Sequence, residues 1–242
     1  QTKRKFDIAQ DLFPEIIEQG QKIYAYKTVE YVKDMGTKER HKKVNLAIGS
    51  GLPESRLSET KKRAIFLDRD GTINVDIGHL NNYKNLKLIE GAAEALSMIN
   101  KSKFLSVCIT NQPVIARGEC TLDGLNDIHA QLEKLIGDEG AYLDKIYFCP
   151  HHPDKGYEGE VIEYKINCTC RKPNTGMVEI AQNDMNIDLA RSWVIGDRTA
   201  DIELANRIGA KSILVKTGAA GEDKKYDAIA TYRANNLLEA VK

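Results

Sequence analysis

Residues 63–74 read Arg-Ala-Ile-Phe-Leu-Asp-Arg-Asp-Gly-Thr-Ile-Asn. An apolar run ends abruptly in two acids, Asp68 and Asp70, and a Gly-Thr turn follows. A short apolar run bounded by polar residues is typical of a buried strand in a parallel sheet. Open α/β sheets bind their ligands at the carboxyl ends of such strands. The stretch therefore predicts an α/β fold, a Rossmann-like parallel sheet flanked by helices, with the two acids at its functional edge.

The spacing of the two acids indicates their chemistry. Neighbouring carboxylates at a strand end can hold a divalent cation, which keeps one ionised as a nucleophile while the other works as an acid or base. A strand ending in an ordinary polar turn explains Asp-x-Asp alone equally well. The full string of apolar strand, Asp-Arg-Asp-Gly-Thr and Ile is far more specific, and it favours the functional interpretation.

Length and composition limit the classes of protein to consider. The chain has 242 residues, with 35 basic and 35 acidic side chains, so it has room for one large or two small domains and no net charge. Balanced charge gives no reason to expect a nucleic-acid partner. No apolar run reaches membrane-spanning length, and the start has no signal-peptide core. We expect a cytoplasmic protein without a membrane partner; its start at Gln1 is consistent with a piece of a longer chain.

The first part of the chain predicts a small appendage. Residues 6–19 have an amphipathic helical pattern with Asp7 as a cap, residues 22–27 suggest a short strand, and Thr37 is a plausible cap of a second helix. Residues 49–63 have the composition of a linker. We therefore divide the chain into residues 1–55 and 56–242.

Residues 31–40, Tyr-Val-Lys-Asp-Met-Gly-Thr-Lys-Glu-Arg, resemble the last part of a sugar-phosphate nucleotidyltransferase domain. The resemblance implies that residues 1–55 are the C-terminal remnant of such a domain and that Asp34 matches an acid that binds its catalytic metal. A nucleotidyltransferase domain, covalently joined or docked, is the implied partner. The glycine-rich nucleotide loop is missing here, so nucleotidyl transfer by this chain is not expected. The alternative is a helical appendage packed on the main domain.

Strands and helices alternate through the rest of the chain. Buried strands are predicted at 104–110, 143–148, 192–195 and 212–216, and helices at 91–101, 122–136, 174–186 and 235–241, with a flexible turn at 218–221. Little room is left for a separate cap domain. We therefore expect an open site, shaped by loops, that suits a small extended substrate.

Polar side chains follow two further strands. Thr110 and Asn111 can donate hydrogen bonds to a phosphoryl oxygen held beside Asp68. Asp197 would complete the cation site, and Asp201 would orient Lys172 or a metal-bound water, although a capped helix start explains these two acids equally well. Arg117 could hold a second anionic group of the substrate, or be a solvated surface arginine.

A zinc site is predicted from Cys149, His151, Cys168 and Cys170. A C-x-H pair and a C-x-C pair supply four ligands for a closed tetrahedral site, which favours a structural role. His152 is the alternative to His151, and disulfide pairing is the alternative to zinc. The loop between the pairs shows no pattern of secondary structure, so we expect zinc to order it. Lys172 follows directly, where its ammonium can neutralise charge on a phosphate and on Asp68.

The order of these motifs along residues 64–241 resembles the haloacid dehalogenase-like phosphohydrolases. Within them, the zinc loop and the strings Thr-Asn-Gln, Ala-Arg-Gly and Cys-x-Cys-Arg-Lys-Pro are similar to the branch of the heptose-bisphosphate phosphatases and histidinol-phosphatases. The resemblance implies Asp68 as nucleophile and Asp70 as general acid/base. It also implies that Mg²⁺ is bound by Asp68, Asp197 and the Asp70 carbonyl, and that the phosphoryl group is held by Thr110 and Lys172. The residues implied to contact the rest of the substrate are Asn111, Arg117 and Arg171. Zinc would be bound by the four Cys and His ligands.

The implied function is Mg²⁺-dependent hydrolysis of a sugar phosphate through an aspartyl-phosphate. We expect removal of the C7 phosphate of D-glycero-D-manno-heptose 1,7-bisphosphate, in the nucleotide-heptose biosynthesis that supplies lipopolysaccharide. Histidinol phosphate is the alternative substrate, and a non-catalytic, zinc-stabilised interaction domain is the alternative class. One departure bears on specificity: Pro113-Val114 stands where the family usually has Ser-Gly.

Overall fold

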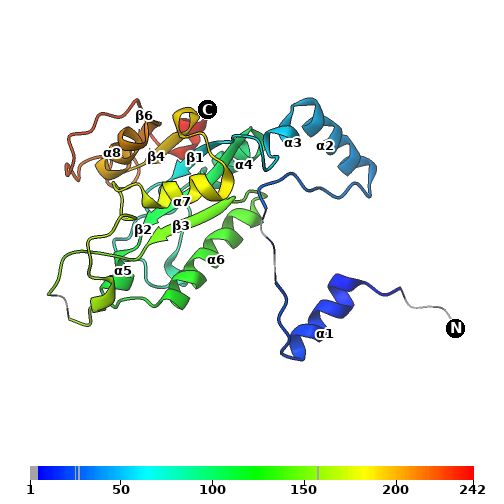
Figure 1. Ribbon diagram of the computed structural model, residues 1–242, viewed down its shortest axis with the longest axis horizontal. Helices are drawn as coiled ribbons and strands as arrows, with labels where there is room; N and C mark the ends of the chain where they lie inside the picture. Colours follow the sequence, from blue (N-terminus) through cyan, green and yellow to red (C-terminus); the bar gives the residue numbers. More distant parts are fainter. Residues whose placement is uncertain (1–4, 25, 27, 157) are drawn as a thin grey trace.

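A six-stranded parallel sheet forms the centre of the computed structural model, which describes residues 5–24, 26, 28–156 and 158–242 (Figure 1). In chain order the strands are β1 (Arg63–Leu67), β2 (Phe104–Asn111), β3 (Lys145–Cys149), β4 (Trp193–Gly196), β5 (Lys211–Val215) and β6 (Tyr232–Ala234). They lie side by side in the order β3-β2-β1-β4-β5-β6. The chain adds β2 and β3 on one side of β1 and then β4, β5 and β6 on the other. The point between β1 and β4 is therefore a topological switch point, where open α/β sheets form their ligand crevice. The predicted fold class is confirmed.

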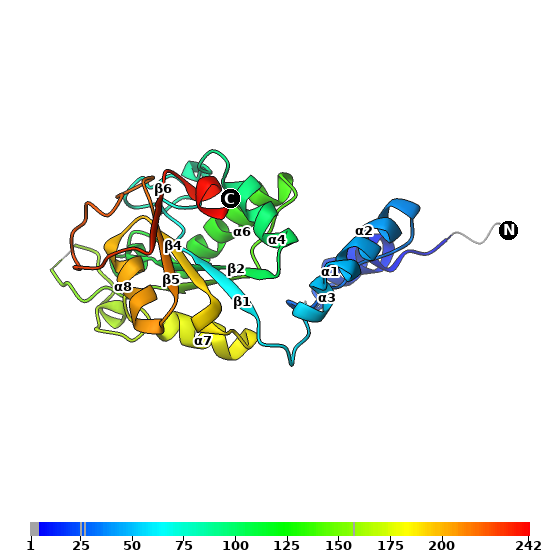
Figure 2. The same ribbon diagram turned by 90° about the horizontal axis from the view of Figure 1, so that it is seen from above.

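Helices cover both faces of the sheet (Figure 2). Because strand residues alternate between faces, Ile65 and Leu67 pack toward α4 (Ala92–Lys101), α6 (Leu122–Asp138) and α9 (Leu237–Val241). Ala64 and Phe66 pack on the opposite face toward α7 (Gly176–Met185) and α8 (Thr199–Ile208). The central strand is therefore buried on both sides, as its continuous apolar run predicts.

Several short elements were not predicted. These are α5 (Pro113–Ala116), strand β6 and three 3₁₀ turns, η2 (Tyr83–Asn85), η3 (Ile162–Tyr164) and η4 (Leu189–Arg191). Each spans three or four residues, too few to show a period of apolar side chains. Pro113 stands in the first turn of α5, and Val114 is buried in a small core with Ile115 and Leu125. The Pro-Val pair thus begins a helix directly beside the predicted site.

The N-terminal elements lie outside the layers of the sheet in both views (Figures 1 and 2). They are η1 (Ile8–Leu12, a π-helix), α1 (Phe13–Glu18) and α2 (Lys38–Gly49). The predicted caps are confirmed, since the side chains of Asp7 and Thr37 accept hydrogen bonds from backbone N–H groups. The strand expected at 22–27 falls partly on residues that the structure does not describe, and residues 22–24 and 26 form no strand.

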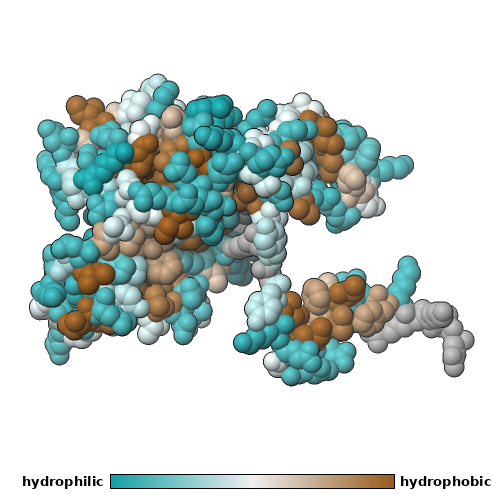
Figure 3. Space-filling view, in the orientation of Figure 1, coloured by the Kyte–Doolittle hydropathy of each residue, from teal (hydrophilic) through white to brown (hydrophobic). Residues whose placement is uncertain are grey.

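Hydrophobic side chains gather on α1 at the surface (Figure 3). Phe13 and Ile17 are among its exposed residues. The derivation of this segment from a nucleotidyltransferase domain stays a prediction, as do the two domain ranges.

The linker expected at 49–63 is folded, which corrects that prediction. It contains α3 (Leu52–Ser55) and two buried cations. Arg56 donates to Asp144 Oδ1 at 2.7 Å and to the Phe104 carbonyl, and Lys62 donates to three backbone carbonyls. Arg56 therefore fastens this segment to the amino-terminal edge of the sheet, whereas Lys62 folds the segment onto itself through the carbonyls of residues 57, 58 and 60. No helix among the described residues is both long and apolar enough to cross a bilayer.

Candidate active site and zinc-binding loop

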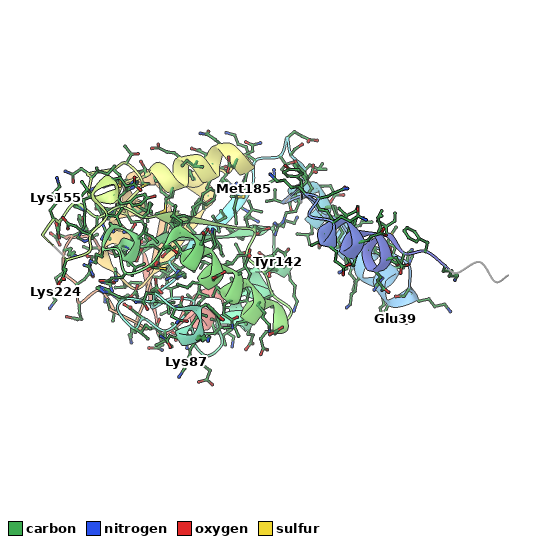
Figure 4. All side chains as sticks on the ribbon, turned by 90° about the horizontal axis from the view of Figure 1, so that it is seen from below. Glu39, Lys87, Tyr142, Lys155, Met185 and Lys224 are labelled. Atoms are coloured by element: carbon green, nitrogen blue, oxygen red, sulfur yellow. The ribbon has the colours of Figure 1, made fainter. Side chains whose placement is uncertain are left out.

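The predicted catalytic residues meet in a cleft of about 330 Å³ at the carboxyl end of the sheet. Lys155 and Lys224, from the loops after β3 and β5, lie at this end of the domain, and Met185 and Tyr142 lie at the other (Figure 4). The floor of the cleft includes Asp68, Asp70, Thr110, Lys172 and Asp201, and its rim includes Arg117, Arg171, Arg198 and Lys225.

Lys172 bridges two of the acids. Its ammonium lies 2.7 Å from Asp68 Oδ1 and 2.6 Å from Asp201 Oδ1, and it also donates to the Ile109 carbonyl at 2.8 Å. The three side chains are buried. Burial alone would lower the pKa of Lys172, but the two carboxylates outweigh it and raise that pKa, so the ammonium is charged. The predicted contact between Asp201 and Lys172 is therefore present.

Three carboxylates form a group that could hold a cation. One oxygen each from Asp68, Asp197 and Asp201 lies within 4.8 Å of the others. Burial and neighbouring acids raise the pKa of Asp68 to about 6 and that of Asp197 to about 8. Asp197 Oδ1 is buried and has no hydrogen-bond partner among the described residues. Lys172 supplies one positive charge for three acids, so this donor set fits an additional hard cation.

Two glycines leave room for the Asp197 carboxylate. A Cβ on Gly71 would stand 2.5 Å from Asp197 Oδ2, and one on Gly218 would stand 2.3 Å from the same atom. Both glycines have positive φ angles, and Ala219 N donates to Asp197 Oδ2 at 2.6 Å. The turn at 218–221, expected to be flexible, thus has its first residues packed against Asp197, from the loop that follows the neighbouring strand β4.

Asp70 is surrounded by donors that the sequence motifs did not identify. Its carboxylate accepts from Asn74 Nδ2 at 2.9 Å, from Gln112 Nε2 at 2.8 Å and from the fully buried Arg69. Burial raises the pKa of Asp70, but the Arg69 charge and these hydrogen bonds outweigh it and hold the pKa below its ordinary value. Asn74 ends the quoted stretch 63–74 and Gln112 ends the Thr-Asn-Gln string, and these positions were the signal that could have identified them.

Thr110 and Asn111 differ in what they offer a ligand. Gln112 Nε2 donates to Thr110 Oγ1 at 2.8 Å, which leaves the Thr110 hydroxyl proton for another acceptor. Asn111, expected to contact substrate, bonds the backbone of Lys172 with both ends of its amide, at 3.0 and 3.2 Å. In this geometry Asn111 holds Lys172 in place.

The predicted arginines lie at the rim. Arg171 Nη1 donates to the His151 carbonyl at 3.2 Å, and Arg117 Nη1 contacts the ring of His79. His79 and Arg198 were not predicted. Nothing in the local sequence around His79 marks a site, because it reaches the cleft through the folding of a distant loop. Arg198 stands between the predicted Asp197 and Asp201, and that position was the signal that could have identified it.

The four predicted zinc ligands form one compact group. The three Sγ atoms are 3.0 to 3.5 Å apart, and His151 Nδ1 lies 3.6 Å from Cys149 Sγ and 3.2 Å from Cys170 Sγ. A tetrahedral zinc with ordinary bond lengths needs edges of roughly 3.5 to 3.8 Å, so the group is close to the required size. All five cysteines are free thiols, which excludes the disulfide alternative in this structure. His152 instead accepts from Asp154 N and stands outside the group.

Contacts within the chain order the loop that carries the predicted zinc ligands, residues 149–170, called here the zinc loop. The buried Lys165 donates to the Asp154 carbonyl at 2.8 Å, and Val161 N donates to the Ala116 carbonyl at 3.0 Å. A Cβ on Gly118 would meet the Gly159 carbonyl at 1.9 Å. The loop therefore packs directly on the turn that carries Arg117.

Comparison with known proteins agrees with this geometry. A D-glycero-beta-D-manno-heptose-1,7-bisphosphate 7-phosphatase from Haemophilus ducreyi is 39% identical over 185 residues, which cover 74% of this chain and 97% of that protein. The chain belongs to this phosphatase family. The Yersinia pestis protein of the same name is 45% identical over 157 residues, covering 64% of this chain and 81% of that protein. The HAD-hydrolase-like family model matches residues 169–240.

Solved structures of similar fold extend the comparison. The D,D-heptose 1,7-bisphosphate phosphatase from B. bronchiseptica, complexed with magnesium and phosphate, has a TM-score of 0.65 at 28% identity, covering 74% of this chain and 96% of that one. A putative HAD-like phosphatase from Mesorhizobium loti has the same TM-score at 29% identity, covering 77% of this chain and 88% of that one. As a member of this family the chain is an enzyme, a phosphatase with a HAD-like fold.

Proposed function

We propose that this phosphatase removes the C7 phosphate of D-glycero-D-manno-heptose 1,7-bisphosphate through an aspartyl-phosphate on Asp68. The observation that carries the proposal is the contact of Asp68 with Lys172 at the floor of a cleft whose rim is cationic. An anionic phosphoryl group would enter such a cleft with its phosphorus next to the Asp68 carboxylate. Family membership supports the choice of substrate, because the relatives are named for it.

In the first step an Asp68 carboxylate oxygen attacks phosphorus, and the bond from phosphorus to the C7 oxygen breaks. The leaving oxygen takes a proton from Asp70, and the heptose 1-phosphate departs. Lys172 and the Thr110 hydroxyl hold the phosphoryl oxygens as charge builds on them. Asn111 contributes by fixing the Lys172 backbone.

In the second step Asp70 takes a proton from water, and the resulting oxygen attacks phosphorus. The acyl-phosphate bond breaks, which releases inorganic phosphate and restores the Asp68 carboxylate and the Asp70 acid. The surrounding donors favour ionised Asp70, the form needed for this step. An incoming phosphate dianion would raise the pKa of Asp70, because a like charge favours the neutral acid needed for the first step.

We assign a magnesium site to Asp68, Asp197 and the Asp70 backbone carbonyl, with Asp201 next to it. When bound, Mg²⁺ supplies positive charge that offsets the phosphate and keeps Asp68 ionised. Zinc is assigned to Cys149, His151, Cys168 and Cys170, where four protein ligands leave no open position for catalysis. Its role would be to hold the backbone that continues into Arg171 and Lys172.

The remote phosphate on C1 would meet Arg117 and Arg171 at the rim. Both guanidiniums are anchored, and Arg side chains match the geometry of phosphate oxygens. Histidinol phosphate, the second candidate from the sequence, carries no second phosphate and would leave this cationic rim without an anion. That contrast favours the bisphosphate.

Phosphate release from the two substrates tests the proposal. With Mg²⁺ present, kcat/KM for the heptose bisphosphate should exceed that for histidinol phosphate, and Asp68→Asn should abolish both. Exposed Asp138→Asn is the matched control and should leave both rates unchanged. A preference for histidinol phosphate would reject the substrate, and an active Asp68→Asn protein would reject the mechanism.

A further inference from the structure

The loop between β1 and η2 reaches both sides of the cleft rim. On one side Asp76 Oδ2 accepts from Arg198 Nη2 at 2.8 Å, and on the other His79 Nδ1 lies 2.8 Å from Glu119 Oε2. Asp76 also shapes the turn between them, because its Oδ1 accepts from Gly78 N at 2.8 Å, and Gly78 has a φ of 85°. The turn thus presents the His79 ring to the residues that follow α5.

His79 stands between a carboxylate and a guanidinium. Its Nδ1 lies 2.8 Å from Glu119 Oε2, while Arg117 Nη1 makes its closest contact with Nε2 and lies 3.4 Å from Nδ1. A carboxylate only accepts and a guanidinium only donates, so this arrangement needs Nδ1 protonated and Nε2 free to accept. That is the neutral Nδ1–H tautomer of imidazole, and it satisfies both neighbours at once. A doubly protonated ring could not accept from Arg117.

We propose that Glu119 and His79 are positioning residues that hold the Arg117 guanidinium in place for the remote phosphate of the substrate. The inference rests on the proposed function, since it takes that phosphate as the group Arg117 binds. A long arginine side chain loses much rotational freedom when it binds an anion. Anchoring Arg117 beforehand reduces that loss, so His79 acts on affinity and not on the chemical step.

The backbone supports the same arrangement. Glu119 N donates to the Val114 carbonyl at 2.9 Å and Gly118 N to the Ile115 carbonyl at 3.0 Å, which turns Arg117 and Glu119 back over the end of α5. Gly118 has a φ of 72° and packs against Gly159 of the zinc loop. Glu119 and Arg117 are therefore held two residues apart on one turn, with the His79 ring between their side chains.

A double-mutant cycle with Arg117 tests the proposal. His79→Ala should raise KM for the heptose bisphosphate by about 5- to 10-fold with little change in kcat, and Glu119→Ala by a smaller factor. In an Arg117→Ala background, His79→Ala should change nothing further, because the residue it positions is gone. His79→Gln keeps one donor and one acceptor and should restore part of the affinity. An effect of His79→Ala that persists undiminished without Arg117 would overturn the proposal.

A second substrate separates this inference from the proposed function. p-Nitrophenyl phosphate has no remote phosphate, so His79→Ala should leave its kcat/KM unchanged, as should the exposed control His41→Ala on both substrates. Equal losses on the two substrates would show a general defect and reject positioning. If the unmodified protein hydrolyses the bisphosphate and His79→Ala matches it, the inference alone fails. If the bisphosphate is bound but not hydrolysed, the proposed function alone fails, and calorimetric affinities for the bisphosphate then decide the role of His79.

Discussion

Single residues at this site act mostly by holding other residues. Lys172 contacts two carboxylates, Asn111 holds the Lys172 backbone, and Gln112 bonds both Thr110 and Asp70. The acids with proposed catalytic roles, Asp68 and Asp70, are therefore the innermost members of a hydrogen-bonded network. Removing an outer member should displace an inner one, so activity is expected to be sensitive to residues that never touch substrate.

Gly71 offers a direct test of that expectation. In Gly71→Ala the new Cβ would stand 2.5 Å from Asp197 Oδ2, at a backbone φ of 82°. The displaced carboxylate should no longer complete the cation site, so kcat/KM should fall by about 100-fold or more and the Mg²⁺ requirement should rise. Initial rates measured across a Mg²⁺ titration would show both effects.

Gly140→Ala is the matched control for Gly71→Ala. Gly140 has a similar φ of 76° but no atom within 4 Å of its Cβ position. Both substitutions carry the same left-handed strain of about 1–2 kcal/mol, so a difference in activity between them reports the clash with Asp197 alone. Equal activities in the two variants would contradict the role given to Gly71.

Among the helices and strands, those with a long pattern of apolar residues were the ones that could be predicted from the sequence. Strands β1 to β5 and helices α4, α6, α7 and α9 were located to within two residues at each end. Strand β6 was missed because it has three residues and only Ala234 is buried. Arg56 and Lys62 were assigned to a linker because a charged run in the sequence does not show which carbonyls and carboxylate will accept hydrogen bonds from its buried side chains.

The residues of the candidate site also fall into two groups, those that could be predicted from the sequence and those that could not. The residues in the first group follow strand ends or form spaced pairs, so their position at one edge of the sheet could be predicted. They are Asp68, Asp70, Thr110, Lys172, Asp197 and the four zinc ligands. His79 could not be found, because its place at the rim depends on where separate loops meet. Arg198 was missed although it directly follows the predicted Asp197. Asn111 was found but given another role, since hydrogen bonds to a backbone leave no mark on the sequence.

Helix α6 carries a buried histidine with consequences for stability. His129 packs against Phe148, with ring centroids 5.6 Å apart, and burial together with the Arg69 charge lowers its pKa to about 3. The unfolded chain binds this proton near pH 6.5 and the folded protein does not. The contribution of His129 to stability is therefore complete above about pH 6.5 and is lost as the pH falls toward 3.

Urea unfolding at two pH values tests this prediction. Between pH 7 and pH 5 the native protein should lose about 2 kcal/mol of unfolding free energy through His129, and His129→Leu should lose that much less over the same interval. All other groups titrate in both proteins, so the difference isolates this ring. The exposed His41→Leu should keep the full pH dependence. A His129→Leu protein with the same dependence as the unmodified one would contradict the assignment.

In the whole molecule, the zinc loop joins parts of the site that the sheet alone does not hold. It begins at Cys149, at the end of β3, and returns through Cys170 to Arg171 and Lys172. Midway it packs on Gly118, beside Arg117. The two packed faces of the sheet, by contrast, are covered by helices and include few of the loop's residues. Losing the loop's order should therefore disable the site while most of the fold remains.

Removal of zinc tests this division. Chelation followed by restoring Mg²⁺ should lower kcat/KM by about 10-fold or more, because Lys172 and both rim arginines lose their fixed positions, whereas far-ultraviolet circular dichroism should change little. Cys168→Ser should behave in the same way and bind less than one zinc per chain by atomic absorption. Cys120→Ser lies outside the ligand group and should keep both zinc and activity. A zinc-free protein with full activity would show that the loop is ordered by its other contacts, such as those of Lys165, and that the metal is dispensable for the geometry of the site.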